Sequence, residues 1–171
     1  MSCSQTLSGL AKDCSANAGG IVVVYLANFE DVTGKTITDS KISAITMASG
    51  AKFKAYHFPK NTGSLTSSYN IGDGDNKYVS SDLVMQFSRM QTASRIEVTA
   101  MAMSDLVALV QDKNGKVWYL GFNEPVTLGD GSDAQTGTQR SDLNRYQVTL
   151  HDESDEYPYE VDASILENLI D

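Results

Sequence analysis

Apolar residues along this chain repeat mostly with the spacing of β-strands. The longest apolar run, IVVVYLA at 21–27, is continuous rather than alternating. A continuous run rich in β-branched residues predicts a strand that is buried on both faces, or nearly so. Residues 79–87 and 143–151 predict two further strands. In the latter, apolar and polar side chains alternate from Tyr146 to Leu150, which is the pattern of a strand with one wet face.

The clearest turn signal is the dipeptide Asn114-Gly115, which stands between two apolar runs. Both residues tolerate positive φ, so they predict a tight β-hairpin joining strands at 105–111 and 116–122. Alternation within the first strand divides its apolar side chains between two faces. One face carries Val107 and Leu109, and the other carries Leu106, Ala108 and Val110.

Two further strand pairings are predicted from shorter patterns. Alternating runs flank Gly50, with Ile42 and Ile45 before it and a run from Phe53 to Phe58 after it, so a hairpin is expected around 48–50. Near the C-terminus, YPYEVD is expected to return as a short partner of the strand at 143–151, since a proline suits an edge position.

The segment 89–103 is the best helix candidate. Its apolar residues recur with spacings of three and four, and its alanines favour a helix. The run RIEVT within it alternates, so a strand remains the alternative there. The last residues, ASILENLID, predict one or two helical turns with Asp162 as a cap.

The remaining segments are polar. Residues 1–18 read as an N-terminal arm, residues 19–162 as one β-rich domain, and residues 163–171 as a C-terminal tail. Two excursions, 60–78 and 123–142, have no core period, and excursions of this length are usually functional or contact elements.

Composition narrows the classes of function. The chain has 171 residues, 22 acidic and 13 basic, and a net charge of −9, which argues against tight binding to phosphate backbones. The N-terminus lacks the charge and apolar run of a secretory signal, and the longest apolar run is too short to span a bilayer. Synthesis in the cytoplasm as a soluble protein, without membrane contact, is therefore expected.

No catalytic motif is visible. GxSxG, HExxH and the P-loop are absent, and His57 and His151 are expected to be structural. Cys3 and Cys14 lack the further ligands of a zinc site. The loops IGDGDNK and LGDGSD depart from the calcium-loop pattern and are read as solvated turns. We therefore expect no catalytic residue, metal or cofactor.

Carboxylate and aromatic residues are the remaining candidates for a binding role. Asp152 and Glu153 stand in an acidic run and are expected on a wet surface, and Trp118 is expected in the core. A sugar- or peptide-binding module would need clustered exposed aromatic residues, and the candidates are spread out along the chain. These candidates are Tyr69, Tyr78, Tyr157 and Tyr159.

The order of these segments resembles the tail tube (major tail) proteins of tailed bacteriophages, in the form found in Bacteroides-type phages and prophages. The stretches that carry the resemblance are GGIVVVYLANFEDV, DLVALVQDKNGKVWYLGF, GTQRSD, LNRYQVTL and PYEVD. The resemblance implies an antiparallel β-sandwich or barrel with one flanking helix, a long interaction loop and terminal arms. It also implies rings, commonly of six subunits, that stack into a conduit for DNA ejection within the virion.

Further expectations follow from this resemblance. The partners would be other copies of the chain, the tape measure protein and other tail proteins, with DNA passing through the lumen without specific binding. No cofactor is implied. Inter-subunit contacts would come from the arm and the two excursions, and the candidate residues are Leu65, Tyr69, Ile71, Arg140, Asp142 and Arg145.

Three alternatives stay open. The chain could be another virion or injection-apparatus component, such as a tail terminator, a head-completion protein or the tube of a secretion-type machine. It could be a monomeric β-sandwich binding module for sugars or peptides. A hydrolase with an unrecognised site is the least favoured.

Overall fold

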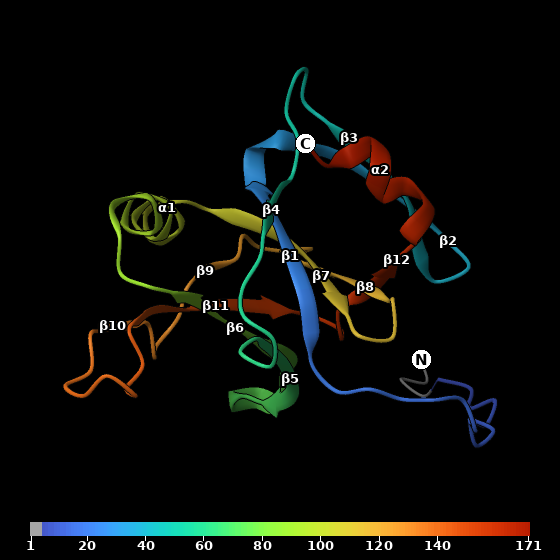
Figure 1. Cartoon of the computed structure of the whole chain (residues 1–171). Coiled ribbons are helices and arrows are strands. Elements are labelled where there is room, and N and C mark those ends of the chain that lie inside the picture. The colour runs from blue at the N-terminus through green and yellow to red at the C-terminus, as the bar shows by residue number, and fades with distance from the viewer. Residues whose placement is uncertain (1–4) are drawn as a thin grey trace.

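The fold is mainly β, in a computed structural model that describes residues 5–171. The first sheet has seven strands in the order β2-β3-β12-β8-β7-β1-β4 (Figure 1). Their bounds are β1 Ile21–Asn28, β2 Val32–Thr38, β3 Lys41–Met47, β4 Lys54–Tyr56, β7 Leu106–Asp112, β8 Val117–Leu120 and β12 Tyr159–Val161. All pairings in it are antiparallel except that of β12 with β3.

The second sheet has the order β10-β11-β6-β5, with β9 also paired to β11. Its bounds are β5 Ser64–Ile71, β6 Lys77–Ser88, β9 Thr127–Leu128, β10 Asp133–Gln135 and β11 Arg145–Ser154. The helices are α1 Thr92–Met103 and α2 Leu166–Leu169, and short 3-10 turns lie at η1 Phe29–Asp31, η2 Asp73–Asp75 and η3 Ala163–Ile165. The two sheets form a sandwich flanked by α1, as expected.

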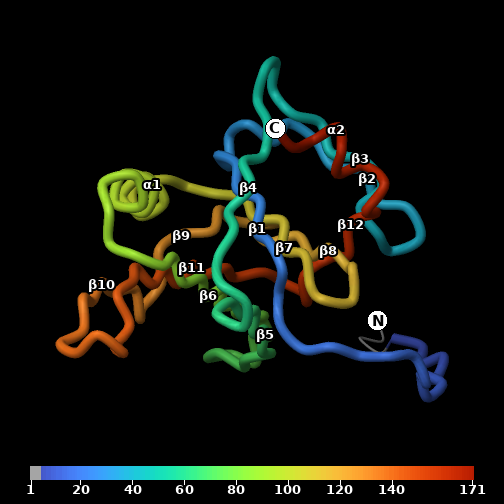
Figure 2. The backbone as a smooth tube through the Cα atoms, in the orientation of Figure 1, coloured from blue at the N-terminus to red at the C-terminus, as the bar shows by residue number. Residues whose placement is uncertain are grey.

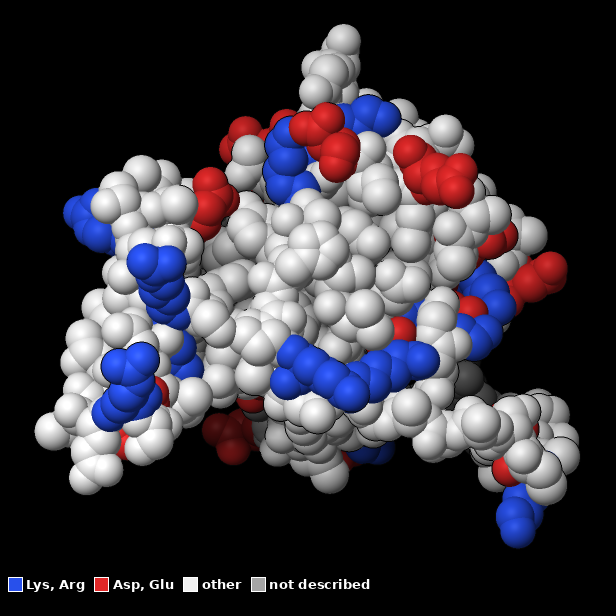
Figure 3. Space-filling view, viewed as in Figure 1, with Lys and Arg blue, Asp and Glu red and all other residues white. Residues whose placement is uncertain are grey.

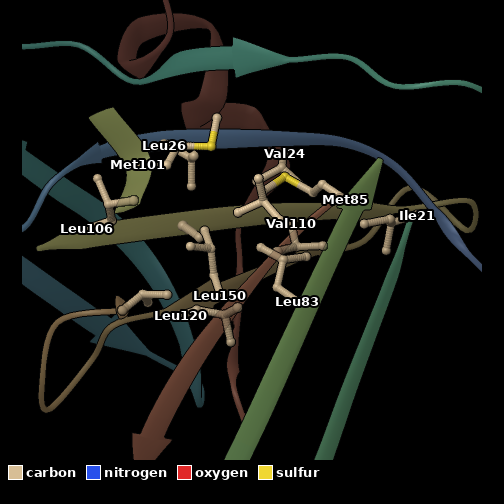
Figure 4. Packing of buried hydrophobic residues seen from close by; sticks show 13 residues of the cluster. Ile21, Val24, Leu26, Leu83, Met85, Met101, Leu106, Val110, Leu120 and Leu150 are labelled. Carbon is tan, nitrogen blue, oxygen red and sulfur yellow. The ribbon is translucent and has the colours of Figure 1, made fainter. Parts of the chain in front are cut away.

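Two apolar cores lie on opposite faces of the first sheet. Val24 and Leu26 of β1 point toward the second sheet, where they meet Leu83, Met85 and Leu150 (Figure 4). The strands of the second sheet run across those of the first at a steep angle in this view. The alternate β1 residues enter the other core, which includes Phe53 of the loop before β4 and Leu166 and Leu169 of α2. The predicted burial of this strand on both faces is therefore confirmed.

The predicted hairpin at Asn114-Gly115 is confirmed as β7–β8. Gly115 has φ of +82°, the left-handed conformation that a glycine adopts without strain. Val107 and Leu109 belong to one core, and Leu106, Ala108 and Val110 to the other, as the alternation predicted. The helix is confirmed over Thr92–Met103, and the strand alternative there is wrong.

The predicted hairpin around 48–50 is wrong. β3 instead turns back onto β2 through Asp39 and Ser40, whose φ values of 52° and 62° fit a tight primed turn. The following run reaches the opposite edge of the sheet, where β4 pairs with β1. The two alternating runs therefore lie on strands that are not neighbours.

The excursion 60–78 is a regular β-hairpin rather than a segment without period. β5 pairs with β6 over eight residue pairs, and the η2 turn joins them. The period was present, because Leu65, Tyr69 and Ile71 all occupy odd positions, with Ser67 between them hydrogen-bonded to Ser81 at 2.7 Å. The other excursion, 123–142, contributes β9 and β10, both paired to β11.

The C-terminal segment YPYEVD does not pair with β11. Its strand β12 lies in the first sheet, where Tyr159 faces Tyr119 of β8 and Val161 faces Ile42 of β3. The predicted terminal helical turns are confirmed, and Asp162 caps them by accepting from the Ser164 N–H at 3.0 Å. The C-terminal tail therefore packs on the core.

The N-terminal arm runs away from the sandwich (Figure 2). Residues 5–20 are exposed, and the apolar side chains of Leu7 and Leu10 are almost completely accessible to solvent. The arm is tied to the β7–β8 turn where the Ala18 N–H donates to Asn114 Oδ1 at 2.9 Å. No helix within the described residues is long and apolar enough to cross a membrane.

Candidate functional site

An aromatic cleft forms where the turn between β11 and β12 meets β5 and β8. The ring of Tyr157 in this turn lies 4.7 Å, centroid to centroid, from that of Tyr69 on β5, edge to face. Trp118 and Tyr159 complete the aromatic walls of a hollow of about 750 Å³. We call these four residues and the space between them the aromatic cleft.

The expectation that these tyrosines are spread out is therefore wrong for Tyr69 and Tyr157, whose rings are in contact, and the half-buried Tyr159 lines the same hollow. Strand pairing brings Tyr69 beside Tyr157 and Tyr159, although 88 positions separate Tyr69 from Tyr157 in sequence (157 − 69). Tyr78 is excluded because it neighbours the buried Val79 on β6 and so points to the opposite face of the sheet.

Charged groups border the aromatic cleft. The Glu160 carboxylate accepts hydrogen bonds from Lys116 Nζ at 2.9 Å and from Lys41 Nζ at 3.0 Å. The bond from Lys116 is the main reason that the pKa of Glu160 lies below its ordinary value. Trp118 is only half-buried, packed on the core, and its indole N–H donates to Asp112 Oδ2 at 3.0 Å. The core expectation for Trp118 thus holds for part of its surface.

The expectation that Asp152 lies on a wet surface is wrong, because only 3% of its surface is exposed. Burial is the main cause that raises its pKa to about 6, and a hydrogen bond from the Gly121 N–H acts in the opposite direction. Its Oδ1 and the Tyr119 hydroxyl are buried without hydrogen-bond partners among the described residues. The sequence pattern did indicate this burial. The alternation of Tyr146, Val148 and Leu150 continues to Asp152, which therefore points to the inward face of the strand.

The predicted contact residues lie at the two opposite edges of the second sheet. On β5, Leu65 packs on the core, while Tyr69 and Ile71 are 50% and 72% exposed. Near the other edge, Arg145 of the internal strand β11 donates to Asp133 Oδ1 of the edge strand β10 and to Gln147 Oε1, both at 2.9 Å.

The loop beside β10 holds the remaining two predicted contact residues. Asp142 accepts from the N–H groups of Thr138 and Gln139 at 2.8 and 2.7 Å, and the bond from Gln139 is the main reason that its pKa is lowered. Arg140 is exposed and makes no ion pair within residues 5–171. Asp142 therefore stabilises its own loop, and Arg140 is the charged member of the set that remains available at the surface.

The outward face of the second sheet is polar and hydrogen-bonded. Gln86 donates to Gln147 Oε1 at 3.1 Å, and His151 Nδ1 lies 2.8 Å from Asp82 Oδ1. The bond to Asp82 is the main reason that the pKa of His151 is raised, and Glu153, at 3.4 Å from Nε2, acts in the same direction. His151 is thus a member of the hydrogen-bonded network on this face.

The other titratable side chains that the sequence singled out lie apart from one another in the part that the structure describes. His57 is exposed in the loop after β4, and Cys14 is exposed on the arm with a free thiol. Cys3 lies outside the described residues. No group of three or more His, Cys, Asp or Glu side chains within residues 5–171 is placed to hold a metal ion. Basic and acidic side chains are interspersed on the face seen in Figure 3, around a wide uncharged area.

Comparison with models of protein families, with curated proteins and with solved structures found no match to this chain.

The burial of Asp152 predicts a stability effect with a definite sign. Since the folded state raises its pKa from 3.8 to about 6, the native protein holds the extra proton and the free energy of unfolding falls as pH rises from about 4 to 6. Asp152→Asn should raise the free energy of unfolding at pH 7.5 by about 1–3 kcal/mol and remove this part of the pH dependence. Urea unfolding at several pH values measures both. Glu153→Gln, at the exposed neighbouring position, is the control and should leave the slope between pH 4 and 6 in place.

The hydrogen bond between Asp82 and His151 predicts a shift visible by NMR. The chain has two histidines, so both ring signals can be followed in one pH titration. Asp82→Asn should lower the pKa of His151, because the carboxylate that favours the imidazolium is removed. An unchanged His151 titration would contradict this geometry. In the wild type, the stabilisation from His151 is present below pH 6.5 and is lost as pH rises through the raised folded pKa.

Proposed function

We propose that this chain is a bacteriophage tail tube subunit that assembles through its second sheet into rings that stack as a conduit for DNA. The observation that carries the proposal is the edge strand β5. Among the described strands β5 pairs only with β6. Its eight residues contain no charge and no proline, and its register with β6 has no bulge.

The other sheet edges are short, bulged or charged, so they are less suited than β5 to recruit a further strand. β2 contains Lys35 and two register shifts, β4 is three residues long and begins with Lys54, and β10 is three residues long with Asp133. Charged, bulged or short edges disfavour the addition of a further strand. β5 alone is long, regular and uncharged, which is the expected form of an edge that another chain covers.

The placement of the predicted contact residues fits side-by-side assembly. Tyr69 and Ile71 lie at the β5 edge, and Arg140 lies beyond the β10 edge of the same sheet. When copies stand side by side, β5 of one copy would meet the short β10 edge of the next, and the loop beside β10, which carries Arg140, would add the contacts that a three-residue strand cannot supply. A closed ring of this kind leaves no exposed strand edge in the shared sheet.

The polar outward face of the second sheet would then line the lumen. Asp82 and Glu153 are the acidic groups of its central strands, and Arg145 is already paired with Asp133. A surface that lacks unpaired basic groups does not hold phosphates, so DNA could slide along it. Within the virion, the partners would be neighbouring rings, the tape measure protein and other tail proteins.

Blocking the β5 edge tests the proposal. Wild-type protein should form rings or tubes in negative-stain micrographs, and Thr66→Lys with Ile71→Lys should abolish them, because two ammonium groups at the edge disfavour strand pairing. Both positions are exposed, so the monomer should keep its melting temperature within a few degrees.

The matched control is Thr36→Lys with Ile37→Lys on β2, which exchanges the same residue types at an edge that is already bulged and charged. It should assemble like the wild type. A wild-type protein that stays monomeric at high concentration in every salt would rule out the proposal.

The aromatic cleft favours a second candidate, a sugar-binding module. Exposed tyrosine rings present apolar faces to a pyranose ring, and the neighbouring carboxylates of Glu156 and Glu160 can accept from sugar hydroxyls. This reading needs no self-assembly.

A glycan array tests this second candidate. If it is right, the monomer binds a neutral oligosaccharide, and Tyr157→Ala weakens binding at least tenfold by removing one stacking face. Tyr78→Ala, a tyrosine on the opposite face, should bind like the wild type. Absence of binding to any glycan removes this candidate and leaves the tube proposal unaffected.

A further inference from the structure

A small cavity opens beside the aromatic cleft, beneath the turn between β11 and β12. Its volume is about 80 Å³, and its lining includes Tyr119, Phe122, Asp152, Asp155 and Glu156. This exceeds the roughly 10–15 Å³ that one water molecule needs. Asp155 and Glu156 are exposed, so the cavity reaches the surface.

Two buried polar atoms lack partners at its inner end. Tyr119 and Asp152 are 1% and 3% exposed, and neither the Tyr119 hydroxyl nor Asp152 Oδ1 has a hydrogen-bond partner among the described residues. An unpaired buried carboxylate oxygen is costly, so a native protein ordinarily supplies it with a donor. A group that enters the cavity and pairs with Asp152 Oδ1 must therefore donate a hydrogen bond, because a carboxylate oxygen is an acceptor.

The charges around the cavity select a cation. Asp152, Asp155 and Glu156 line it, and the lining contains no Lys, Arg or His. Glu124 and Glu153 add negative potential at Asp152, and only the adjacent His151 opposes them. An anion would be repelled here, and a cation would supply the missing positive charge.

The aromatic walls suit an ammonium group. The ring of Phe122 lies 4.8 Å from that of Tyr159 and 6.2 Å from that of Tyr119. The protein already holds one ammonium on these rings, since Lys35 Nζ lies 4.5 Å from the Phe122 centroid and 5.4 Å from that of Tyr119. Lys35 donates to the Phe122 carbonyl at 3.1 Å and makes no ion pair with Asp152.

We infer that this cavity binds a primary ammonium group carried on an alkyl chain, with Asp152 as its counter-ion and the Tyr119 hydroxyl as a second polar contact. The inference is independent of the proposed function. The ammonium could belong to a free alkylamine or to a lysine of a second copy, of which Lys12 on the exposed arm is the candidate.

The test uses the full chain and n-butylammonium chloride as the probe. The backbone amide of Gly121 is the reporter, because its N–H donates to the Asp152 carboxylate. Its NMR signal should shift saturably at pH 7.5 with butylammonium but not with tetraethylammonium, which has the same charge and no N–H donor. Asp152→Asn should weaken binding at least tenfold, while Glu153→Gln, which removes only a more distant charge on the outward face, should weaken it far less.

The pH dependence of butylammonium binding gives an independent test. With a pKa of about 6, roughly one tenth of Asp152 is ionised at pH 5, so butylammonium should bind about tenfold more weakly there than at pH 7.5. Equal binding at both pH values, undiminished binding by a folded Asp152→Asn variant, or no saturable shift in the wild type would overturn the inference.

Sedimentation then identifies the source of the ammonium. If Lys12 of a second copy occupies the cavity, butylammonium and Lys12→Gln should each reduce self-association of the wild type. Saturable butylammonium binding without either effect assigns the cavity to a free alkylamine.

Discussion

The pairing of β1 with β7 is the constraint on which the rest of the structure depends. Both strands are buried on both faces, so their alternate side chains fill two separate cores. Burying a Val or Leu side chain contributes roughly 1.5–3 kcal/mol. A one-residue slip would exchange the side chains of the two cores, which have different shapes, so the register of the central strands is strongly specified.

The second sheet uses one face for packing and leaves the other wet. Its inner face places Leu83, Met85 and Leu150 against β1, whereas its outer face carries Gln, Asp, His and Glu side chains that bond to one another. Such a sheet is stable as one half of a sandwich and still presents a continuous strand edge at β5. The packed face of this sheet stabilises the subunit, and under the proposed assembly its β5 edge would make the contacts between copies.

Asp152 is the buried carboxylate on an inward face that is otherwise mostly apolar. Its carboxylate is desolvated and has only the Gly121 N–H as a described donor, so the native state holds it at an energetic disadvantage near neutral pH. An asparagine would avoid the charge at almost the same volume. A buried acid beside a surface-connected cavity is therefore better explained by what enters the cavity than by packing of the chain alone.

Local pattern was sufficient for several elements. The β-branched run at 21–27, the Asn114-Gly115 turn and the alanine-rich segment of α1 each depend on interactions between residues near in sequence, and all three were predicted correctly. The period in β5 could also have been read, since its apolar residues share one parity, but Ser67 interrupts it because that position faces Ser81 rather than a large side chain.

The sequence by itself therefore determined the β-rich class, the central strands and the helix, because φ preferences and apolar spacing act over a few residues. Only the tertiary structure decided that β12 joins β8 and β3 and that Tyr69 meets Tyr157. These outcomes depend on which strands become neighbours across 40 to 119 residues (159 − 119 and 161 − 42). That choice is made by the packing of whole faces, and no local pattern encodes it.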